Sequence, residues 1–383
     1  MFIRNTWYVV AEPSELPRGG LLARTVLNER LVLYRTADGL VVAFNDACPH
    51  RFAPLSAGRV EGNCIRCPYH GSLYDEKGRC VAVPGQHGKH GMNIGLTPHP
   101  VIERHGYIWL WMGDHKRADD GQSIPDWFAS ADPASDAWQG RADRFLSMPV
   151  YYELINDNLH DVSHVEFVHP ETLGTTVIPQ MYRMSEQEQT PECYVRKDIQ
   201  PGWMRIDFHA ENIQGGPILH QMLAFQRERS EWTDNVDWDL TLRYATPSYF
   251  LFNHRTKAVG EADAKAIQIA SLHAITPETE SSSHYFFHTA NNLHAAPERC
   301  RAFTELCADS LVFAFNQDKA LISEQMKRVP DGGRSAESLA KVSFLGDTTP
   351  MVGRRLIRAQ IAGEQDREVD RNQAAPTHKV AAV

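Results

Sequence analysis

The sequence lacks several features that would assign it to large classes of proteins. No apolar run approaches the ~18–20 residues that a helix needs to span a bilayer. Residues 1–8 have neither the basic nor the apolar region of a signal peptide. Positive charge is not in excess, because 39 Lys and Arg residues stand against 48 Asp and Glu residues and give a formal net charge of −9. We therefore expect a cytoplasmic protein that binds neither membranes nor nucleic acid.

Cysteine is scarce as well. The 383 residues include seven cysteines, an odd number, which is unlike the disulfide framework of a secreted protein. In a reducing compartment, some of these thiols stay free to bind metal. The length suggests two or three domains and an ample hydrophobic core.

The first part of the chain has the pattern of short strands and loops. Apolar segments at residues 31–34 and 40–44 flank Ala37-Asp38-Gly39, which predicts a β-hairpin. Residues 107–111 predict another strand. Between these strands, residues 46–100 are dense in Cys, His, Pro and Gly, a composition that suits loops folded tightly around a cofactor.

The rest of the chain has a different pattern, which begins after a polar linker predicted at residues 114–122. Helical spacing is found at residues 152–167 and 297–328. Residues 192–290 alternate apolar and polar side chains in strand-sized pieces, which predicts one large antiparallel sheet. The polar, Ala-rich tail at residues 364–383 is expected to be disordered.

Two Cys–His pairs lie in the loop-rich stretch. The first pair is Cys48 and His50. Sixteen residues separate His50 from the second pair, Cys67 and His70. Two thiolates suit one iron of a [2Fe-2S] cluster and two imidazoles suit the other, and replacing thiolates by neutral imidazoles raises the reduction potential. The rival interpretation is a zinc-binding interaction module, because two Cys and two His ligands also suit tetrahedral zinc.

A second group of potential ligands lies in the helical segment that follows. Two ligand sets are possible, each with one aspartate and two histidines: Asp157, His160 and His164, or Asp161, His164 and His169. His160 and His164 share a helix face. His164 and His169 are roughly 140° apart on an ideal helix, so the second set requires the helix to end or distort before His169, which the following Pro170 favours. The spacing alone leaves both sets open.

Both groups of residues resemble motifs of one family. Cys-x-His-x16-Cys-x-x-His resembles the Rieske domain of the aromatic-ring oxygenase superfamily, and Asn-Leu-x-Asp-x-x-His-x4-His resembles the mononuclear-iron motif of Rieske oxygenases of the vanillate and dicamba demethylase type. The first resemblance implies a [2Fe-2S] cluster on four residues: Cys48, His50, Cys67 and His70.

The second resemblance assigns His164 and His169 as ligands of a mononuclear Fe(II) and leaves His160 as a neighbouring helical histidine. It also implies a third ligand, Asp318, in a stretch that ends in Asp-Lys. Relatives commonly have Glu where this chain has Gln317. Two histidines and one carboxylate leave positions open for O₂. The other carboxylates considered, Asp309 and Glu324, match the family pattern less well.

The resemblance implies two further roles. In this superfamily the aspartate at Asp161 connects the iron ligand His164 to a Rieske histidine, His70 of the partner subunit, within a head-to-tail ring that is commonly a trimer. His273 matches a histidine that reaches the polar group of the substrate, such as a carboxylate or phenolic oxygen. The alternative for His273 is a sheet histidine satisfied by its neighbours, and His284 could be a residue of the same kind.

The resemblance implies an α+β fold, with an all-β Rieske [2Fe-2S] domain at residues 1–115 and a catalytic domain at residues 116–363, in which a large antiparallel sheet wraps helices. It implies an O₂-dependent monooxygenase that demethylates an aromatic substrate at oxygen or nitrogen, with electrons from NAD(P)H through a reductase and possibly a ferredoxin. The alternatives are aromatic-ring hydroxylation, cis-dihydroxylation, and a Rieske electron carrier without catalysis of its own.

Overall fold

The computed structural model describes residues 1–85, 93–130, 138–335 and 344–374. Its N-terminal part is built from three small antiparallel sheets, ordered β1-β10-β9, β2-β3-β4 and β5-β6-β7-β8. Their strands are β1 Thr6–Ala11, β2 Leu21–Val26, β3 Glu29–Arg35, β4 Val41–Asn45, β5 Arg59–Glu61, β6 Cys64–Arg66, β7 Leu73–Tyr74, β8 Cys80–Ala82, β9 Val101–Arg104 and β10 Tyr107–Met112. The predicted hairpin is confirmed as β3 and β4, and the predicted strand at residues 107–111 as β10.

One seven-stranded antiparallel sheet dominates the C-terminal part, as predicted. The strand order is β11-β17-β16-β15-β14-β13-β12. The strands are β11 Gln139–Met148, β12 Cys193–Gln200, β13 Trp203–Ile213, β14 Val236–Ala245, β15 Tyr249–Ala258, β16 Ile267–Thr279 and β17 Ser282–Asn291. Strand β11 lies outside the predicted stretch and pairs with β17 at one edge of the sheet.

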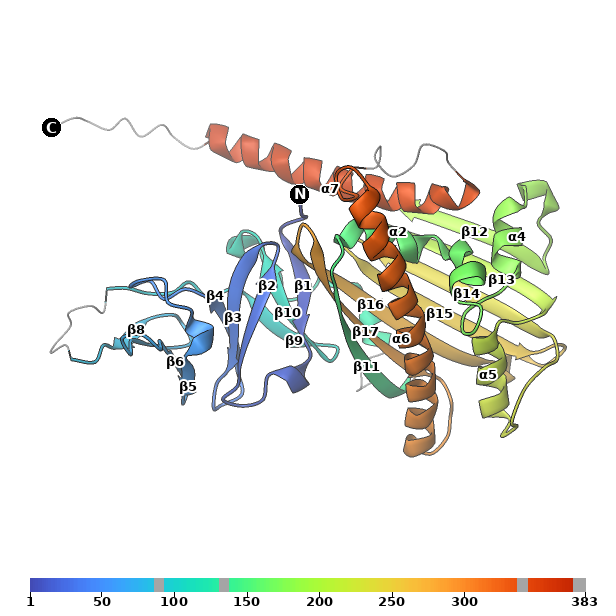
Figure 1. Ribbon diagram of the computed structural model, residues 1–383, viewed down its shortest axis with the longest axis horizontal. Coiled ribbons are helices and arrows are strands. Elements are labelled where there is room, and N and C mark those ends of the chain that lie inside the picture. Colours follow the sequence, from blue (N-terminus) through green and yellow to red (C-terminus); the bar gives the residue numbers. More distant parts are fainter. Residues whose placement is uncertain (86–92, 131–137, 336–343, 375–383) are drawn as a thin grey trace.

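The helices precede, interrupt and follow this sheet along the chain. They are α1 Trp127–Ser130, α2 Tyr152–His160, α3 Val165–Val168, α4 Val177–Arg183, α5 Pro217–Gln226, α6 Pro297–Arg328 and α7 Thr348–Ala374. The long helix α6 has the bounds that the sequence predicted. Figure 1 shows α6 crossing the sheet beside α2, with α7 running along the edge of the assembly of helices.

The two faces of the seven-stranded sheet have different partners, because neighbouring residues of a strand point to opposite faces. Phe250 and Phe252 point into the main core, which also contains residues of α2, α5 and α6. Tyr249 and Leu251 point to the other face and pack against the N-terminal sheet, in a cluster that includes Trp7. The helix-covered face is therefore the one that can enclose a site within the C-terminal part.

The predicted tail disorder was wrong for residues 364–374, which continue helix α7. Alanine, glutamate, glutamine and arginine are strong helix formers, and the start of the tail has a tertiary contact, because the Glu364 carboxylate accepts a hydrogen bond from the backbone N–H of Arg4 at 2.9 Å. Residues 375–383 of the same prediction lie outside the described part of the chain.

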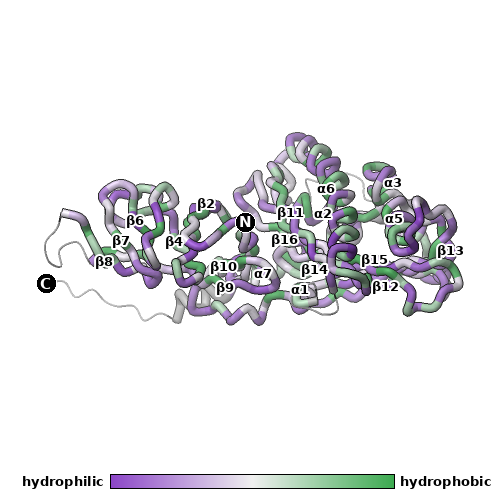
Figure 2. The backbone as a smooth tube through the Cα atoms, turned by 90° about the horizontal axis from the view of Figure 1, so that it is seen from below, coloured by the Kyte–Doolittle hydropathy of each residue, from purple (hydrophilic) through white to green (hydrophobic). Residues whose placement is uncertain are grey.

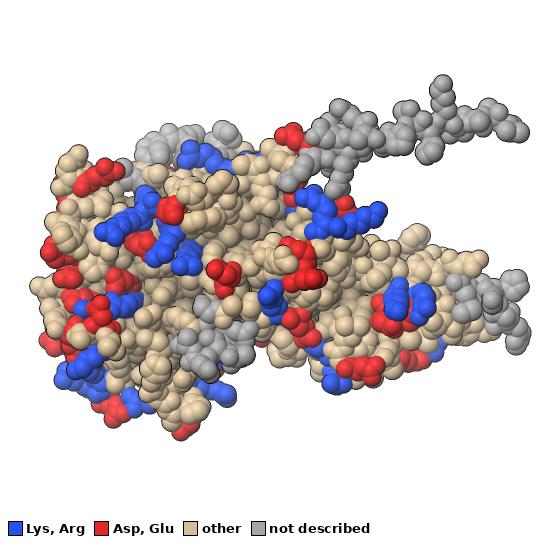
Figure 3. Space-filling view, turned by 180° about the vertical axis from the view of Figure 1, so that it is seen from behind, with Lys and Arg blue, Asp and Glu red and all other residues tan. Residues whose placement is uncertain are grey.

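Hydrophobic and hydrophilic residues are interspersed along the backbone (Figure 2). In the described ranges, no helix is both long and apolar enough to cross a membrane. On the face drawn in Figure 3, acidic and basic side chains also lie among one another, in keeping with the modest net charge of −9.

Candidate metal centres and substrate cavity

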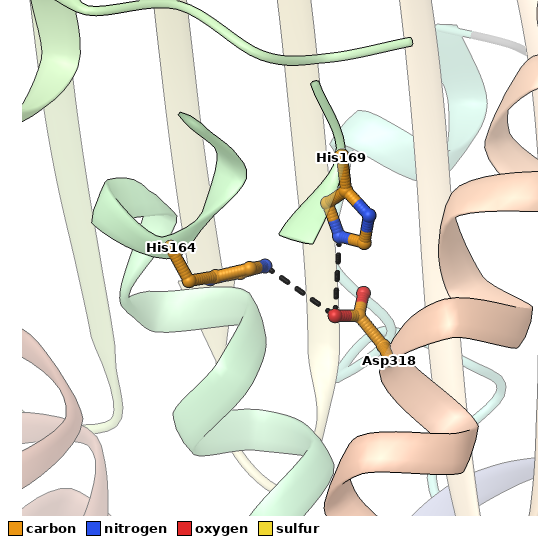
Figure 4. A group of neighbouring side chains, drawn as sticks. All are labelled: His164, His169 and Asp318. Atoms are coloured by element: carbon orange, nitrogen blue, oxygen red, sulfur yellow. Dashed lines mark ion pairs between the residues drawn. The ribbon is translucent and has the colours of Figure 1, made fainter. Parts of the chain in front are cut away.

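Three side chains from two separate parts of the chain meet under the helix-covered face of the large sheet. They are His164, His169 and Asp318, and their potential ligand atoms all lie within 4.8 Å of one another. The Asp318 Oδ1 atom is 3.1 Å from His169 Nε2 and 3.5 Å from His164 Nε2. Figure 4 shows both rings directed at this carboxylate, which projects from α6.

A break in the predicted helix makes this convergence possible. Helix α2 ends at His160, and Asp161 has non-helical backbone angles, φ −99° and ψ 88°. The Asp161 carboxylate accepts hydrogen bonds from the backbone N–H of Ser163 at 2.9 Å and from its hydroxyl group at 2.6 Å. A 3₁₀ turn and the short α3 follow, and His169 lies just beyond α3. The helix thus ends before His169, as the second ligand set requires.

Hydrogen bonds behind the two rings fix which nitrogen faces the carboxylate. His164 Nδ1 lies 2.5 Å from the main-chain oxygen of Asp161, and His169 Nδ1 lies 2.8 Å from Oε1 of Gln317. Carbonyl oxygens only accept, so each ring donates from Nδ1 and keeps an Nε2 lone pair for a cation. Two such imidazoles and one carboxylate suit non-haem Fe(II) with open coordination positions.

The electrostatics of the group also favour a cation. Asp318 is 3% exposed, and a buried carboxylate is costly unless it is paired or coordinates a metal. Burial lowers the pKa of His169, but the neighbouring Asp318 and Gln317 outweigh burial and the net shift is upward. Asn158 donates a hydrogen bond to Asp318 Oδ1 at 3.0 Å and so orients the carboxylate.

The other ligand set is not assembled. Asp157 binds the guanidinium group of Arg354, with a shortest distance of 2.7 Å. His160 is 1% exposed and packs against the rings of Tyr244 and Phe250, with centroid separations of 4.4 and 4.8 Å. Burial lowers the pKa of His160 to about 3, so it is a neutral core residue.

The alternative carboxylates also have other partners. Asp309 is 2.7 Å from the guanidinium group of Arg144. Glu324 binds Lys327 and Arg328 on the exposed side of α6. Of the three carboxylates considered on α6, only Asp318 faces the two histidines.

A mostly apolar cavity adjoins this group. It is lined by residues of α2 to α6, their connecting turns and the large sheet: Asn158, Leu159, Val162, His164, Val165, His169, Leu173, Ile178, Ile218, Leu240, Phe252, His254, Ile269, Ser271, His273, Cys307, Leu311, Phe315 and Asp318. A small aromatic molecule would contact chiefly aliphatic and aromatic side chains there, with a few polar groups to orient it.

His273 lines this cavity, whereas His284 is not among the residues that line it. Both ring nitrogens of His273 already have partners, because Nε2 contacts the Ser271 hydroxyl group and Nδ1 is 2.9 Å from the Tyr285 hydroxyl group. His284 Nε2 is instead 3.0 Å from the main-chain oxygen of Thr25. Sequence reasoning identified neither Ser271 nor His254, although Ser271 follows the period-two pattern from His273 that places it on the same face.

The two Cys–His pairs meet on two loops of similar build at the far end of the N-terminal part. The backbone N–H of Cys48 donates to the carbonyl of Ala53 at 2.8 Å, and that of Cys67 donates to the carbonyl of Ser72 at 2.9 Å. Both thiols are buried. Burial raises the pKa of the Cys67 thiol, so a bound metal is needed to stabilise its thiolate.

The two histidines of these loops form a separate, exposed pair. The ring centroids of His50 and His70 are 4.7 Å apart, and both residues are exposed. A buried thiol pair beside an exposed imidazole pair fits a cluster whose two irons have different ligands. The residues present therefore fit a Rieske [2Fe-2S] cluster, with its histidine side facing outward.

Two family models match the parts of the chain that contain these residues. The sequence model of the Rieske [2Fe-2S] domain matches residues 6–98, and that of the vanillate O-demethylase oxygenase C-terminal domain matches residues 148–363. The iron-sulfur subunit TsaM1 of the toluene-4-sulfonate monooxygenase system of Comamonas testosteroni is 35% identical over 334 residues, 86% of this chain and 91% of that protein.

Two further similarities concern dicamba enzymes. The oxygenase component of dicamba O-demethylase from Stenotrophomonas maltophilia is 35% identical over 291 residues, 76% of this chain and 79% of that protein. The crystal structure of dicamba monooxygenase bound to dicamba superposes with a TM-score of 0.78 at 28% sequence identity, covering 95% of this chain and 99% of that one.

Proposed function

The chain belongs to the Rieske non-haem iron oxygenases of the vanillate O-demethylase type, and from this premise we propose that it removes a methyl group from oxygen or nitrogen of a small aromatic substrate. The observation that carries the proposal is the apolar cavity, whose wall contains His164, His169 and Asp318. A substrate held there would present its methyl group to the metal position.

The chemistry has a simple balance. When bound, the mononuclear Fe(II) would supply the activation of O₂, for which open coordination positions are needed. One oxygen atom enters the methyl C–H bond, and two electrons and two protons reduce the other oxygen atom to water. The hydroxymethyl ether or amine then breaks its bond to the heteroatom, releasing formaldehyde and leaving a phenol or an amine.

The protein's own residues prepare this step. In this proposal the ligands are His164, His169 and Asp318, and the apolar wall of the cavity excludes water from the reacting methyl group. Asn158 holds the Asp318 carboxylate in place. His273 lies in the cavity wall and, through its hydrogen-bonded neighbours, helps to orient the polar end of the substrate.

Electrons would reach the site from a separate reductase that uses NAD(P)H, in the cytoplasm, possibly through a ferredoxin. Cys48, Cys67, His50 and His70 would hold the cluster that receives them. The strands β5, β6 and β8 lie at one end of the molecule and the helices α5 and α6 toward the other (Figure 1), an arrangement that supports transfer between subunits. We propose a head-to-tail trimer in which Asp161 connects His164 to His70 of the partner subunit.

A second candidate reaction is hydroxylation without loss of a carbon atom. Toluene-4-sulfonate, named for the relative TsaM1, has no methyl group on oxygen or nitrogen, so a monooxygenase that acts on it performs a different oxidation. For this chain, that observation supports hydroxylation of the substrate's ring or of a ring methyl group as the alternative. A Rieske protein that only carried electrons would not need a second metal site formed by His164, His169 and Asp318.

The test is a turnover assay with a surrogate reductase, NADH, O₂ and a panel of methoxyarenes, N-methylarylamines and methylarenes. Formaldehyde in a one-to-one ratio with a phenol or an amine supports demethylation. A hydroxylated product that keeps every carbon atom would establish the second reaction instead. The Asp318→Ala variant serves as the control for reactions caused by the reductase alone.

A further inference from the structure

Ser271, His273 and Tyr285 form a chain of hydrogen bonds across strands β16 and β17. Tyr285 is 1% exposed, and its hydroxyl group lies 2.9 Å from His273 Nδ1. The other ring nitrogen, Nε2, contacts the hydroxyl group of Ser271. Of these three residues, Ser271 and His273 line the cavity and Tyr285 lies behind them.

The direction of these hydrogen bonds follows from the cost of leaving a buried hydroxyl proton without an acceptor. If His273 donated from Nδ1, the Tyr285 proton would be left buried with no other acceptor among the described residues, which is costly. The Tyr285 hydroxyl group therefore donates to Nδ1, and Nε2 carries the single ring proton and donates to Ser271 Oγ. The hydroxyl proton of Ser271 is then free to be donated into the cavity.

A second donor is fixed in the same way on the neighbouring strand. The indole N–H of Trp238 donates to His254 Nδ1 at 3.4 Å. Indole nitrogen is a donor only, so the neutral His254 ring carries its proton on Nε2. His254 lines the cavity too, and Ser271 pairs with Phe252, two residues before His254, so both donors are on the same face of the sheet.

The charges of the cavity wall point to the kind of molecule that these donors serve. Among the described residues that line the cavity there is no Lys or Arg, and the one carboxylate is that of Asp318. Burial lowers the pKa of His273 to about 3 and that of His254 to about 4, so neither ring supplies a positive charge near neutral pH. Asp318 would neutralise part of the charge of a bound Fe(II), and an anion held at Ser271 would have no cationic side chain as a partner, which is costly.

We propose that Ser271, held by His273 and Tyr285, is the residue that donates a hydrogen bond to the substrate, and that the substrate is a neutral aromatic molecule with a hydrogen-bond acceptor, such as a carbonyl group, in place of a carboxylate or sulfonate. His273 is then a positioning residue that acts through Ser271. This inference rests on the proposed function, because it assigns the cavity to the substrate of that reaction.

The test uses three probe ligands of nearly equal size: 4-methoxyacetophenone, which is neutral and carries an acceptor; 4-ethylanisole, which lacks the acceptor; and 4-methoxybenzoate, which is an anion. Binding to the iron-loaded protein is measured by calorimetry without reductase. The ketone should bind about 3- to 10-fold more tightly than the ethyl compound, as one neutral hydrogen bond provides, and more tightly than the benzoate.

The Ser271→Ala variant should bind the ketone and the ethyl compound equally, and Ser271→Cys, which keeps the volume better, should retain only a small preference. His273→Phe should also lose the preference, and His273→Gln should restore part of it, because an amide N–H can donate to Ser271 Oγ. A mainly structural role for His273 would weaken all three ligands together. The matched control is Cys307→Ala, which trims another cavity wall and should keep the ratio.

A ketone preference that survives in Ser271→Ala would overturn the role of Ser271. Tighter binding of the benzoate, or binding of none of the probes, would overturn the substrate class. Formaldehyde release is measured separately under turnover. If the ketone binds but yields no formaldehyde, the demethylation reaction is contradicted while the binding ratio still supports Ser271. If the benzoate yields formaldehyde in preference to the ketone, demethylation is supported and the neutral substrate class is contradicted.

Discussion

The hydrogen bond behind each metal-facing histidine is the residue-scale feature on which the mononuclear site depends. Gln317 accepts from His169 Nδ1, and the main-chain oxygen of Asp161 accepts from His164 Nδ1. Both bonds leave Nε2 on the side of the Asp318 carboxylate, so each ring is oriented as a ligand before any metal binds. His160 has no comparable orientation toward Asp318 and is enclosed by Tyr244 and Phe250.

The first prediction separates the two ligand sets. His164→Ala, His169→Ala and Asp318→Ala should each lower the iron content from about three to about two per chain while the Rieske absorption remains. His160→Ala should keep both centres, although it should lower stability. Metal analysis together with the visible spectrum checks this. Loss of the mononuclear iron from His160→Ala but not from His169→Ala would show that the helix-face set was right.

The second prediction concerns Asp161. Its carboxylate accepts from Ser163 where α2 ends, and asparagine can cap in the same way. If Asp161 connects the two histidines as proposed, Asp161→Asn should retain both iron centres and the oligomer but slow electron transfer from the Rieske cluster by at least about tenfold, because the connecting charge is lost. Single-turnover oxidation of pre-reduced protein, followed at the Rieske absorbance, measures this rate. Unchanged reoxidation coupled to product would contradict the bridging role.

Among single residues, the sequence indicated both candidate ligand sets, but the spacing of their histidines could not decide between them. The choice depends on the backbone of Asp161 and on Arg354, nearly two hundred positions along the chain, which binds Asp157. A local pattern contains neither fact. Ser271 was missed for a similar reason, because its importance comes from Tyr285 on another strand.

At the scale of elements, helix α7 approaches α2 very closely at Gly353. A Cβ atom at this position would lie 2.4 Å from Cε1 of His160. The His160 ring cannot give way easily, because it is held by Tyr244 and Phe250. Gly353 therefore sets the distance between the two helices, beside the Asp157–Arg354 ion pair.

The third prediction is that the effect of Gly353→Ala on the free energy of unfolding changes sign when His160 is replaced by alanine. Gly353→Ala should destabilise the protein by roughly 1–3 kcal/mol, because overpacking outweighs the roughly 0.5–1 kcal/mol that alanine contributes to a helix. In the His160→Ala background, the same substitution should be stabilising, since the obstructing ring is gone. Urea denaturation of the four proteins of this double-mutant cycle provides the measurement. Equal effects of Gly353→Ala in both backgrounds would mean that His160 is not the obstacle.

The elements show where sequence patterns succeed and where they fail. Helix α6 and strands β12 to β17 were predictable, since each buries one continuous stripe or one alternating face. Strand β11 was missed because five of its ten residues are charged or polar and do not alternate regularly with apolar ones. Its place in the sheet comes from pairing with β17. The end of α7 was read as disordered from composition, although the same residues favour a helix.

At the scale of the whole molecule, the Rieske loops and the cavity occupy different ends of one chain. The N-terminal sheet is fixed to the back of the large sheet by a shared core that includes Trp109 and Leu272. Thr276 also donates a hydrogen bond to the main-chain oxygen of Val9 at 2.6 Å. These contacts hold the N-terminal sheet against the large sheet of the same chain, and this supports the proposal that electrons pass from the Rieske cluster to the mononuclear site of another subunit.

The last prediction follows from this arrangement. Cys67→Ser should lack the cluster and His164→Ala should lack the mononuclear iron, so each protein alone should be inactive. In a head-to-tail ring formed by co-expressing both in equal amounts, an intact cluster of one subunit faces an intact iron of the next at roughly a quarter of the junctions. Product formation should therefore return to roughly a quarter of the wild-type rate. A co-expressed pair of His164→Ala and His169→Ala, which shares the same defect, should remain inactive. If transfer occurred within one chain, no mixture could recover activity, because every chain would still lack one of its two centres.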